Sequence, residues 1–357
     1  MIVYLFLVCI VIICCYVEVA LVSNDNYDER NSVRVVVAIV CYLLILLIGV
    51  LRYEYFGVDC FEYRKYYFDK VENYSWLSLL TNFKIDNGFF IITKIISVMT
   101  DDYWIYRAII YTFTFSCYYY VIVKKSKYVS VGVIVFLGIG LLNSMFFILR
   151  QSLAMAICFI AILKIPRKPS ISVITILFAI TIHKTAIIFL AAICLYYLVR
   201  RKLTFVEILV FTGVSYALLS FVLDFIIKTY AGGIYATIEI QGGGYNYFIY
   251  LIVEIVLLML IINKKRLQND ERVVYYFNVS SCTVFVQGCA MKWELLSRIG
   301  SYFSMFKIML VPELLISFSN LKTRIIFLSA IIFIYGSWFI YRVIDNPYLI
   351  HTFELFE

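Results

Sequence analysis

Charged residues are scarce in this sequence. Asp, Glu, Lys and Arg together make up 15% of the 357 residues, whereas 64% are hydrophobic and the mean hydropathy is +0.93. A soluble domain averages roughly half apolar and a quarter charged residues. A chain this apolar has too little polar sequence to cover a water-facing globule, which excludes a soluble enzyme, a nucleic-acid-binding domain and a disordered chain. The net charge of +8 therefore indicates basic loops beside a membrane.

Metal-binding patterns are also missing. The chain has only two histidines, His183 and His351, which excludes a histidine-rich metal centre. None of the ten cysteines forms a C-x-x-C pair, and nearly all lie in apolar runs with no histidine nearby. We interpret them as small buried apolar residues rather than as a disulfide framework or a zinc site. No metal or cofactor is expected.

Long apolar runs make up most of the chain. Crossing a hydrocarbon core of about 30 Å takes about 20 apolar residues in a helix. Candidate crossings are 2–22, 33–51, 103–123, 128–148, 150–165, 203–223, 246–263, 273–291, 300–319 and 325–342. Two stretches are too short for a comfortable crossing: 87–100, and the pair 170–182 and 184–199 divided at His183. The fold class is therefore all-α, a polytopic integral membrane protein with a single transmembrane domain over residues 1–357.

The basic residues predict the orientation. About half of the 31 Lys and Arg residues lie in five short loops, which the positive-inside rule places in the cytoplasm. These loops lie around Lys124, Arg167, Arg200, Lys264 and Lys322. Residues 170–199 must then leave and return with His183 near the turn, and 87–100 becomes a half-helix in or against the outer leaflet. The prediction is about twelve crossings with both termini outside.

This orientation gathers the unusual polar segments on the outer side. The main outer loops are 52–102, which is rich in aromatic residues, and the glycine-rich 224–245. The second loop either gates an entrance or is a plain connector. A site facing the outside, or lying in the outer leaflet, follows from this asymmetry.

The segment LRYEYFGVDCFEYRKYYF at residues 51–68 mixes aromatic rings with carboxylates. Asp59 and Glu62 lie among Phe61, Tyr63 and Tyr67. This combination suits carbohydrate, because sugar rings stack on aromatic faces while carboxylates accept hydrogen bonds from hydroxyl groups. The alternative is an amphipathic helix in the membrane interface with its tyrosines in the aromatic belt.

Three polar residues stand out within apolar stretches. Arg150 lies in NSMFFILRQSLAMAI, where a cation costs about 2.5–3.5 kcal/mol to insert, so it should face the protein interior or a water-filled cavity. Its planar guanidinium suits phosphate, and the alternative is an arginine that snorkels to headgroups. Arg298 poses the same choice, with Lys292 one or two turns earlier. His183 is a candidate general base or phosphate ligand, or else a histidine that only ends a helix.

Several motifs together resemble a known family. In order, they are Arg52 at the end of the second span, G-x-D-x-x-x-Y-x-x-x-Y from Gly57 to Tyr67, N-G-F at Asn87–Phe89, N-x-x-x-x-x-x-R-Q-x-x-A from Asn143 to Ala154, I-H-K-T-A at Ile182–Ala186, R-x-x-x-Y-F at Arg298–Phe303, and Pro347-Tyr348. The set is similar to the EpsG-like branch of the Wzy-type O-antigen polymerases. Members of that branch often carry a glutamate two residues before the aromatic residue of this N-G-F element, a position that is Asn87 here and is preceded by Asp86.

The resemblance implies a glycosyltransferase of the bacterial inner membrane, active on its periplasmic side. Such enzymes join oligosaccharide repeat units carried on undecaprenyl diphosphate, which is the leaving group. Arg150 and Arg298 are the first candidates for binding the diphosphate and stabilising its developing charge, followed by Lys292 and Arg52. His183, Asp59 and Glu62 are the candidate bases for the attacking hydroxyl group. Tyr63, Tyr67 and Phe61 would line the glycan path.

Two other functions remain alternatives. A flippase of the same lipid-linked sugar would have similar spans, but flippases usually show internal repeats, and the two halves of this chain have no convincing similarity. An O-antigen ligase shares the donor and the reaction type. The expected partners are the lipid-linked oligosaccharide, membrane lipids and a Wzz-like chain-length regulator, and no nucleic acid.

Overall fold

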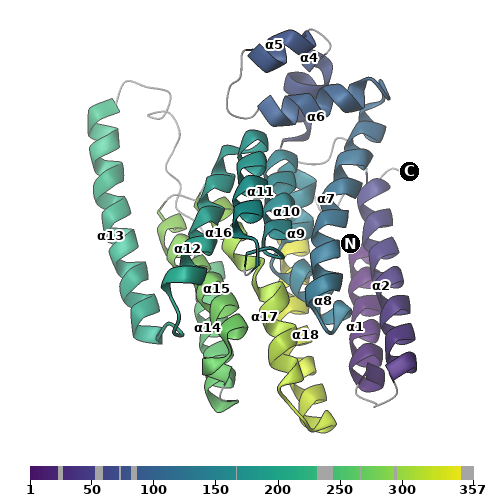
Figure 1. Ribbon diagram of the computed structural model, residues 1–357, viewed down its shortest axis with the longest axis vertical. Helices are drawn as coiled ribbons and strands as arrows, with labels where there is room; N and C mark the ends of the chain where they lie inside the picture. The colour runs from purple at the N-terminus through teal and green to yellow at the C-terminus, as the bar shows by residue number, and fades with distance from the viewer. Residues whose placement is uncertain are drawn as a thin grey trace. The chain divides into compact units, whose positions relative to one another are not determined.

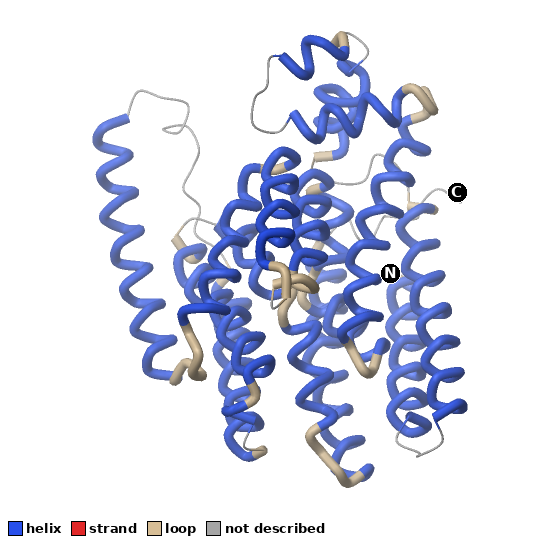
Figure 2. The backbone as a smooth tube through the Cα atoms, viewed as in Figure 1, coloured by secondary structure: helices blue, strands red, loops and turns tan. Residues whose placement is uncertain are grey.

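The computed structural model describes residues 1–22, 27–52, 59–71, 74–81, 87–165, 167–230, 244–265, 267–292 and 296–346. Within these ranges every regular element is a helix and none is a strand (Figure 2). The predicted all-α class is therefore confirmed. Several predicted features fall outside the described residues: Gly57, Asp86, most of the glycine-rich loop, and Pro347-Tyr348 with His351.

The chain divides into two compact units, residues 1–190 with 311–357 and residues 191–310. Helices of the first unit are α1 (Ile2–Val22), α2 (Tyr27–Val50), α3 (Cys60–Tyr63), the π-helix η1 (Arg64–Phe68), α4 (Asp69–Val71), α5 (Trp76–Thr81), α6 (Asn87–Ser97), α7 (Tyr103–Lys125), α8 (Val129–Gly138), α9 (Leu141–Phe147), α10 (Leu149–Ala161), α11 (Pro169–Ile182), the 3-10 helix η2 (Lys184–Phe189) and α18 (Leu321–Asp345). Helices of the second unit are α13 (Phe205–Tyr230), α14 (Tyr245–Lys264), η4 (Leu267–Asn269), α15 (Glu271–Ala290) and α16 (Ser297–Ser304) (Figure 1). Two further helices, α12 (Leu190–Leu198) and α17 (Lys307–Ile316), each include residues of both units.

Several of the helices are long and apolar enough to cross a membrane. Five continuous stretches qualify by length and composition: Ile2–Leu21, Asn31–Val50, Tyr245–Lys264, Ser297–Ile316 and Leu321–Asp345. A sixth qualifies if the bent pair α8 and α9 is counted as one span. The prediction of a polytopic membrane protein is confirmed, and the number of twelve crossings stays a prediction.

One predicted crossing is broken into two shorter helices, and one predicted helix break is observed. The predicted span 128–148 consists of α8 and α9, which meet at an angle of 56°. The cause is local, because Gly140 has a φ of +82° that few residues other than glycine adopt. The predicted break at His183 is also observed, between α11 and η2.

Helix α8 forms the centre of the first unit. All ten of its residues, from Val129 to Gly138, are buried, and it packs against α1, α2, α7 and α18 (Figure 1). A helix that is hydrophobic on every face is buried on every face. The run VSVGVIVFLG lacks a polar side for this reason.

A buried carboxylate caps the start of α8. Glu18 of α1 has no exposed surface, and its carboxylate oxygens accept hydrogen bonds from the backbone N–H groups of Val129 and Ser130, both at 2.8 Å. Helix N-termini carry unsatisfied N–H groups and partial positive charge, which a carboxylate stabilises. Glu18 therefore connects α1 to the first turn of the central helix.

The predicted cytoplasmic loops of the first unit lie at one end of it. Helices α7 and α10 run in the same direction, since the Tyr111 ring packs on Phe146 just before α10, while the Tyr118 hydroxyl bonds the Ser152 carbonyl at 3.3 Å and its ring packs on Phe159. The basic loops that follow these two helices therefore lie at the same end. A third basic loop joins them, because the Arg324 guanidinium donates to the hydroxyl of Tyr128 at 3.0 Å.

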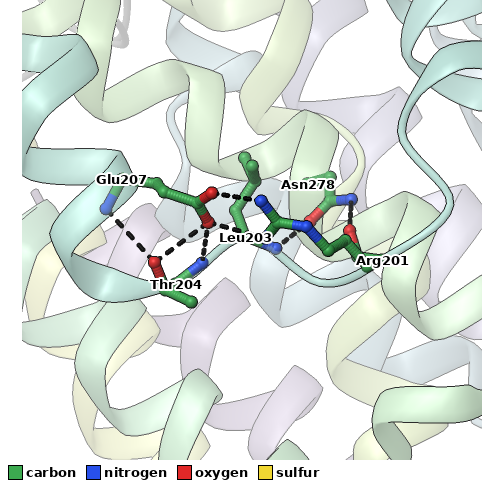
Figure 3. A network of polar contacts seen from close by, with 5 residues as sticks. All are labelled: Arg201, Leu203, Thr204, Glu207 and Asn278. Carbon is green, nitrogen blue, oxygen red and sulfur yellow. Dashed lines mark hydrogen bonds and ion pairs between the residues drawn. The ribbon is translucent and has the colours of Figure 1, made fainter.

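In the second unit, a capping box starts α13. The Thr204 N–H donates to the Glu207 carboxylate at 2.8 Å, and the Glu207 N–H donates to the Thr204 hydroxyl at 3.3 Å (Figure 3). Asn278 of α15 holds the preceding segment by accepting from the Leu203 N–H at 2.9 Å and donating to the Arg201 carbonyl at 2.8 Å. Asn278 is buried, and both the oxygen and the nitrogen of its amide are hydrogen-bonded, which fixes the connection between α12 and α13.

Candidate functional site

Aromatic side chains from η1 and α6 form one cluster in the first unit. The Tyr67 ring lies 5.2 Å from that of Phe89 and 4.6 Å from that of Phe90, and the Tyr63 ring lies 5.8 Å from Tyr67 and 6.0 Å from Phe89. The spacing of four residues places both tyrosines on one face of the helical segment, which turns with a π-helical step. The N-G-F element therefore meets the Y-x-x-x-Y element, and Phe90 adds a ring that the sequence motifs did not include.

Arg150 lies against this aromatic cluster. Its guanidinium carbon is 4.9 Å from the centre of the Tyr67 ring, within the range of a cation–π contact. Its backbone N–H donates to the Tyr63 hydroxyl at 3.5 Å. The residue occupies the first turn of α10, just after the chain leaves helical geometry at Ile148. Arg150 and the two predicted glycan-binding tyrosines, 83 to 87 residues apart in the chain, are thus brought together.

Burial changes the chemistry of Tyr63. Only 7% of the side chain is exposed, and this desolvation raises the pKa of the Tyr63 hydroxyl to about 12, although Arg150 works in the opposite direction. The hydroxyl group therefore stays protonated at neutral pH and remains a hydrogen-bond donor.

The other predicted residues of the loop lie around Tyr63 at different depths. Asp59 is half-buried, and its carboxylate also acts electrostatically on the Tyr63 hydroxyl. Glu62 is exposed, as is Phe61, with 62% of its side chain accessible. Among the described residues, Asp59 is therefore a carboxylate that acts on Tyr63, whereas Glu62 and Phe61 are exposed on α3.

His183 belongs to the same end of the first unit. Helices α10 and α11 have 13 and 14 residues and form a tightly packed antiparallel hairpin, so the start of α10, with Arg150, lies beside the end of α11 (Figure 1). His183 ends α11 with an extended backbone, and its N–H donates to the Ala179 carbonyl at 3.0 Å. The half-buried His183 follows Thr181 by two residues, and Thr181 lies against Gly88 of the N-G-F element.

The glycine of the N-G-F element makes this contact possible. A Cβ atom on Gly88 would lie 2.3 Å from the hydroxyl oxygen of Thr181 and 2.8 Å from its carbonyl oxygen. No side-chain rotation relieves a collision with backbone. We therefore expect Gly88→Ala to separate α6 from α11 and to lower the free energy of unfolding by about 1–3 kcal/mol.

Thermal unfolding of the purified variant in detergent measures this effect. The matched control is Gly213→Ala in α13, where a Cβ atom meets nothing within 4 Å, so a neutral or slightly stabilising change is expected. Equal stability of the Gly88 and Gly213 variants would contradict the close approach of α6 to α11.

Arg52 contacts the end of α9, which precedes Arg150 in the chain. Only 3% of the residue is exposed, its guanidinium donates to the Phe146 carbonyl at 2.8 Å, and its central carbon lies 4.5 Å over the Phe146 ring. The buried Arg107 donates to the Arg52 carbonyl in turn. The structure thus places two arginines close to the start of α10. Arg107 could have been singled out from the sequence, because it is an ionisable residue inside an apolar span.

The remaining predicted diphosphate ligands belong to the second unit. Arg298 is exposed in the first turn of α16, and the half-buried Lys292 follows α15 with its ammonium group 5.7 Å from the centre of the Tyr216 ring. Both keep the diphosphate-binding role as a prediction. No group of three or more His, Cys, Asp or Glu side chains suited to a metal ion occurs among the residues that the structure describes.

The sequence profile of one family covers most of the chain. The EpsG family profile matches residues 34–355. The protein belongs to the EpsG family. Membership of the EpsG family associates this membrane protein with polysaccharide biosynthesis. Comparisons with curated proteins and with solved structures found no match.

Within the EpsG match lie all the motifs from the G-x-D-x-x-x-Y-x-x-x-Y element to Pro347-Tyr348. The resemblance to the EpsG family is therefore confirmed, and that to the Wzy-type O-antigen polymerases stays a prediction. Four of these motifs, centred on Tyr63, Asn87, Arg150 and His183, lie together in the first unit.

Proposed function

We propose that this EpsG-family protein is a membrane glycosyltransferase that polymerises lipid-linked oligosaccharide repeat units. The observation that carries the proposal is Arg150, a cation in the interior of an apolar chain whose guanidinium lies 4.9 Å from the Tyr67 ring. A guanidinium suits a diphosphate and aromatic rings suit sugars, so one cluster has the chemistry to bind both halves of a diphosphate-linked glycan. The substrate proposed is the repeat unit on undecaprenyl diphosphate.

The reaction transfers a growing glycan to the next unit. A hydroxyl oxygen of the acceptor attacks the anomeric carbon of the donor's reducing-end sugar, and the bond from that carbon to the diphosphate oxygen breaks. The electron pair leaves with undecaprenyl diphosphate, and the hydroxyl proton passes to a base, with His183, Asp59 and Glu62 as candidates. Arg150 stabilises the charge that develops on the diphosphate, with Arg298, Lys292 and Arg52 as further candidates.

The depth of Arg150 supports a substrate with a lipid tail. Helix α10 has 13 residues, so Arg150 lies about 20 Å along the helix from the basic loop at Lys164. A hydrocarbon core is about 30 Å thick. With the basic loop at the cytoplasmic surface, the guanidinium lies within the outer half of the membrane. At this depth the headgroup of a prenyl diphosphate would reach it from the surrounding lipid.

Purified protein and the lipid-linked repeat unit alone test the proposal. We expect a ladder of products on a gel together with release of undecaprenyl diphosphate, with no nucleotide added. Transport of the lipid-linked sugar across vesicles without new glycosidic bonds would instead show the flippase alternative. A single transfer to lipid A core without a ladder would show an O-antigen ligase.

The orientation makes a separate prediction. Lys184 is exposed next to His183, whereas Lys125 and Lys265 belong to predicted cytoplasmic loops. A membrane-impermeant maleimide added to intact cells lacking an outer barrier should label Lys184→Cys but not Lys125→Cys or Lys265→Cys, once native cysteines are replaced. Labelling of position 125 from outside would reverse the proposed topology and move the site to the cytoplasmic side.

A further inference from the structure

The chain breaks twice just before Arg150. The first break, at Ile139 and Gly140, bends α8 from α9 by 56°, and the second, at Ile148, separates α9 from α10. Helix ends leave backbone carbonyls without helical partners, and in an apolar region each one needs another donor. Carbonyl acceptors without helical partners therefore arise at the end of α8 and at the end of the seven-residue α9, which is about 10 Å long.

An arginine of α18 supplies the donor at the first break. Arg342 Nη1 donates to the Ile139 carbonyl at 3.1 Å, and its guanidinium also lies 5.7 Å from the Trp338 ring. The contact depends on Gly140, because a Cβ atom at that position would lie 1.7 Å from Arg342 Nη1. The guanidinium therefore occupies the space that the glycine leaves open.

Arg52 supplies the donor at the second break. Its Nη1 donates to the carbonyl of Phe146, the second-last residue of α9, at 2.8 Å. The guanidinium stacks on the ring of the same residue, 4.5 Å from its centre, which fixes its plane. Guanidinium groups from elsewhere in the chain thus bind the two breaks that flank α9, one at the Ile139 carbonyl that ends α8 and one at the Phe146 carbonyl near the end of α9.

We infer that Arg342 and Arg52 are positioning residues, which hold the chain at the two breaks flanking α9 and thereby set the position of the Arg150 guanidinium against Tyr67. The connection from α9 to Arg150 is short, since Arg150 lies only three residues after the last residue of α9. The inference rests on the proposed function, in which Arg150 binds the diphosphate. Arg52 then acts on Arg150 through the backbone of α9 rather than by direct contact with the substrate.

Arginine suits this task better than lysine. The guanidinium has five N–H donors in a planar fork and keeps its charge when buried, so it can bond a carbonyl and stack on a ring at once. Lysine carries its three N–H donors on a compact ammonium group at the end of a flexible stem, without the planar face that stacks on a ring. An Arg342→Lys variant should therefore retain part of the wild-type kcat, and Arg342→Gln should lose most of it.

The chain offers a matched control on the same helix. Arg324, at the start of α18, also donates to a carbonyl, that of Phe318 at 3.0 Å through Nε, and bonds the Tyr128 hydroxyl. It lies 18 residues, about 27 Å along the helix, from Arg342. Arg324→Gln thus removes the same kind of bond without touching α9.

The experiment compares full-length Arg342→Gln, Arg342→Lys, Gly140→Ala and Arg324→Gln in detergent or nanodiscs. Turnover of the lipid-linked repeat unit is measured as kcat and KM, with thermal unfolding and amide hydrogen exchange as parallel readouts. We expect Arg342→Gln and Gly140→Ala to lower kcat by about 10- to 100-fold, because a displacement of about 1 Å at a reacting group has effects of this size. Exchange over residues 141–152 should quicken, while Arg324→Gln keeps kcat within about twofold.

Two results would overturn the inference. One is wild-type turnover in Arg342→Gln, and the other is an equal loss of kcat in Arg324→Gln, which would indicate general destabilisation. If the wild-type protein itself forms no polymer, the proposed function fails, and hydrogen exchange then decides the inference alone. Faster exchange over residues 141–152 in Arg342→Gln but not in Arg324→Gln supports it, and unchanged exchange refutes it.

Discussion

Replacing Arg150 with alanine is expected to lower polymer formation by a factor of about 100 or more. Removing one preorganised donor from a site where negative charge develops typically lowers kcat by about 10²- to 10³-fold. The environment of Arg150 favours a large effect, because the half-buried residue has its guanidinium over the Tyr67 ring. Arg150→Lys should be intermediate, since a lysine keeps the charge but not the fork that matches a diphosphate.

The assay uses purified variants with the lipid-linked repeat unit, and thermal unfolding shows that each variant folds. The matched control is Arg64→Ala. Arg64 is a partly exposed arginine of the aromatic segment 51–68 that lies 3.9 Å from Asp69 and 5.8 Å from the centre of the Tyr103 ring. Such surface contacts contribute little, so near-normal polymer is expected from this variant. Near-normal polymer from a folded Arg150→Ala would remove Arg150 from the site.

The second large effect concerns an ion pair inside the second unit. Lys307 has no exposed surface and Glu254 is 3% exposed, and the lysine ammonium donates to the carboxylate. Each lies near the middle of a helical stretch long enough to cross a membrane. Lys307→Met should therefore lower the free energy of unfolding by about 3–5 kcal/mol, because it leaves a buried carboxylate without its cation.

Removing both charges gives the decisive comparison. The double variant Glu254→Gln with Lys307→Met should recover most of the loss, since a neutral pair of similar volume is often as stable as a buried ion pair. Denaturant or thermal unfolding in detergent measures all three proteins. Arg201→Gln, which breaks the exposed pair with Glu207, serves as the surface control and should change stability far less. Equal stability of the Lys307 single variant and the wild type would show that the pair contributes nothing.

The sequence predicted the class of this protein and the positions of most helices. Apolar run length is a local property, so 2–22 and 325–342 were recognisable as the helices α1 and α18 without knowledge of their neighbours. The break at His183 was also predictable, because the apolar segments on either side are each too short to span. The motif set indicated the EpsG family, which the profile match confirms.

Other features were invisible to local patterns. The bend at Gly140 interrupts an apolar run that looks continuous in sequence, and a single glycine in such a run does not reveal its φ angle. The roles of Arg52 and Arg342 were hidden for a related reason, since both lie at predicted span ends where an arginine commonly contacts lipid headgroups. Their actual partners are the carbonyls of Phe146 and Ile139, far away in the chain.

Hydropathy and motif order by themselves determined that the protein is a helical membrane protein of the EpsG family, because both are written along the chain. Only the tertiary structure decided that Arg150 meets Tyr63 and Tyr67 and that the end of α11 brings His183 to the same region. The physical reason is that apolar helices bury equally well in many arrangements. Which polar side chains meet is settled by close contacts such as Gly88 on Thr181, and those depend on atoms from segments far apart in sequence.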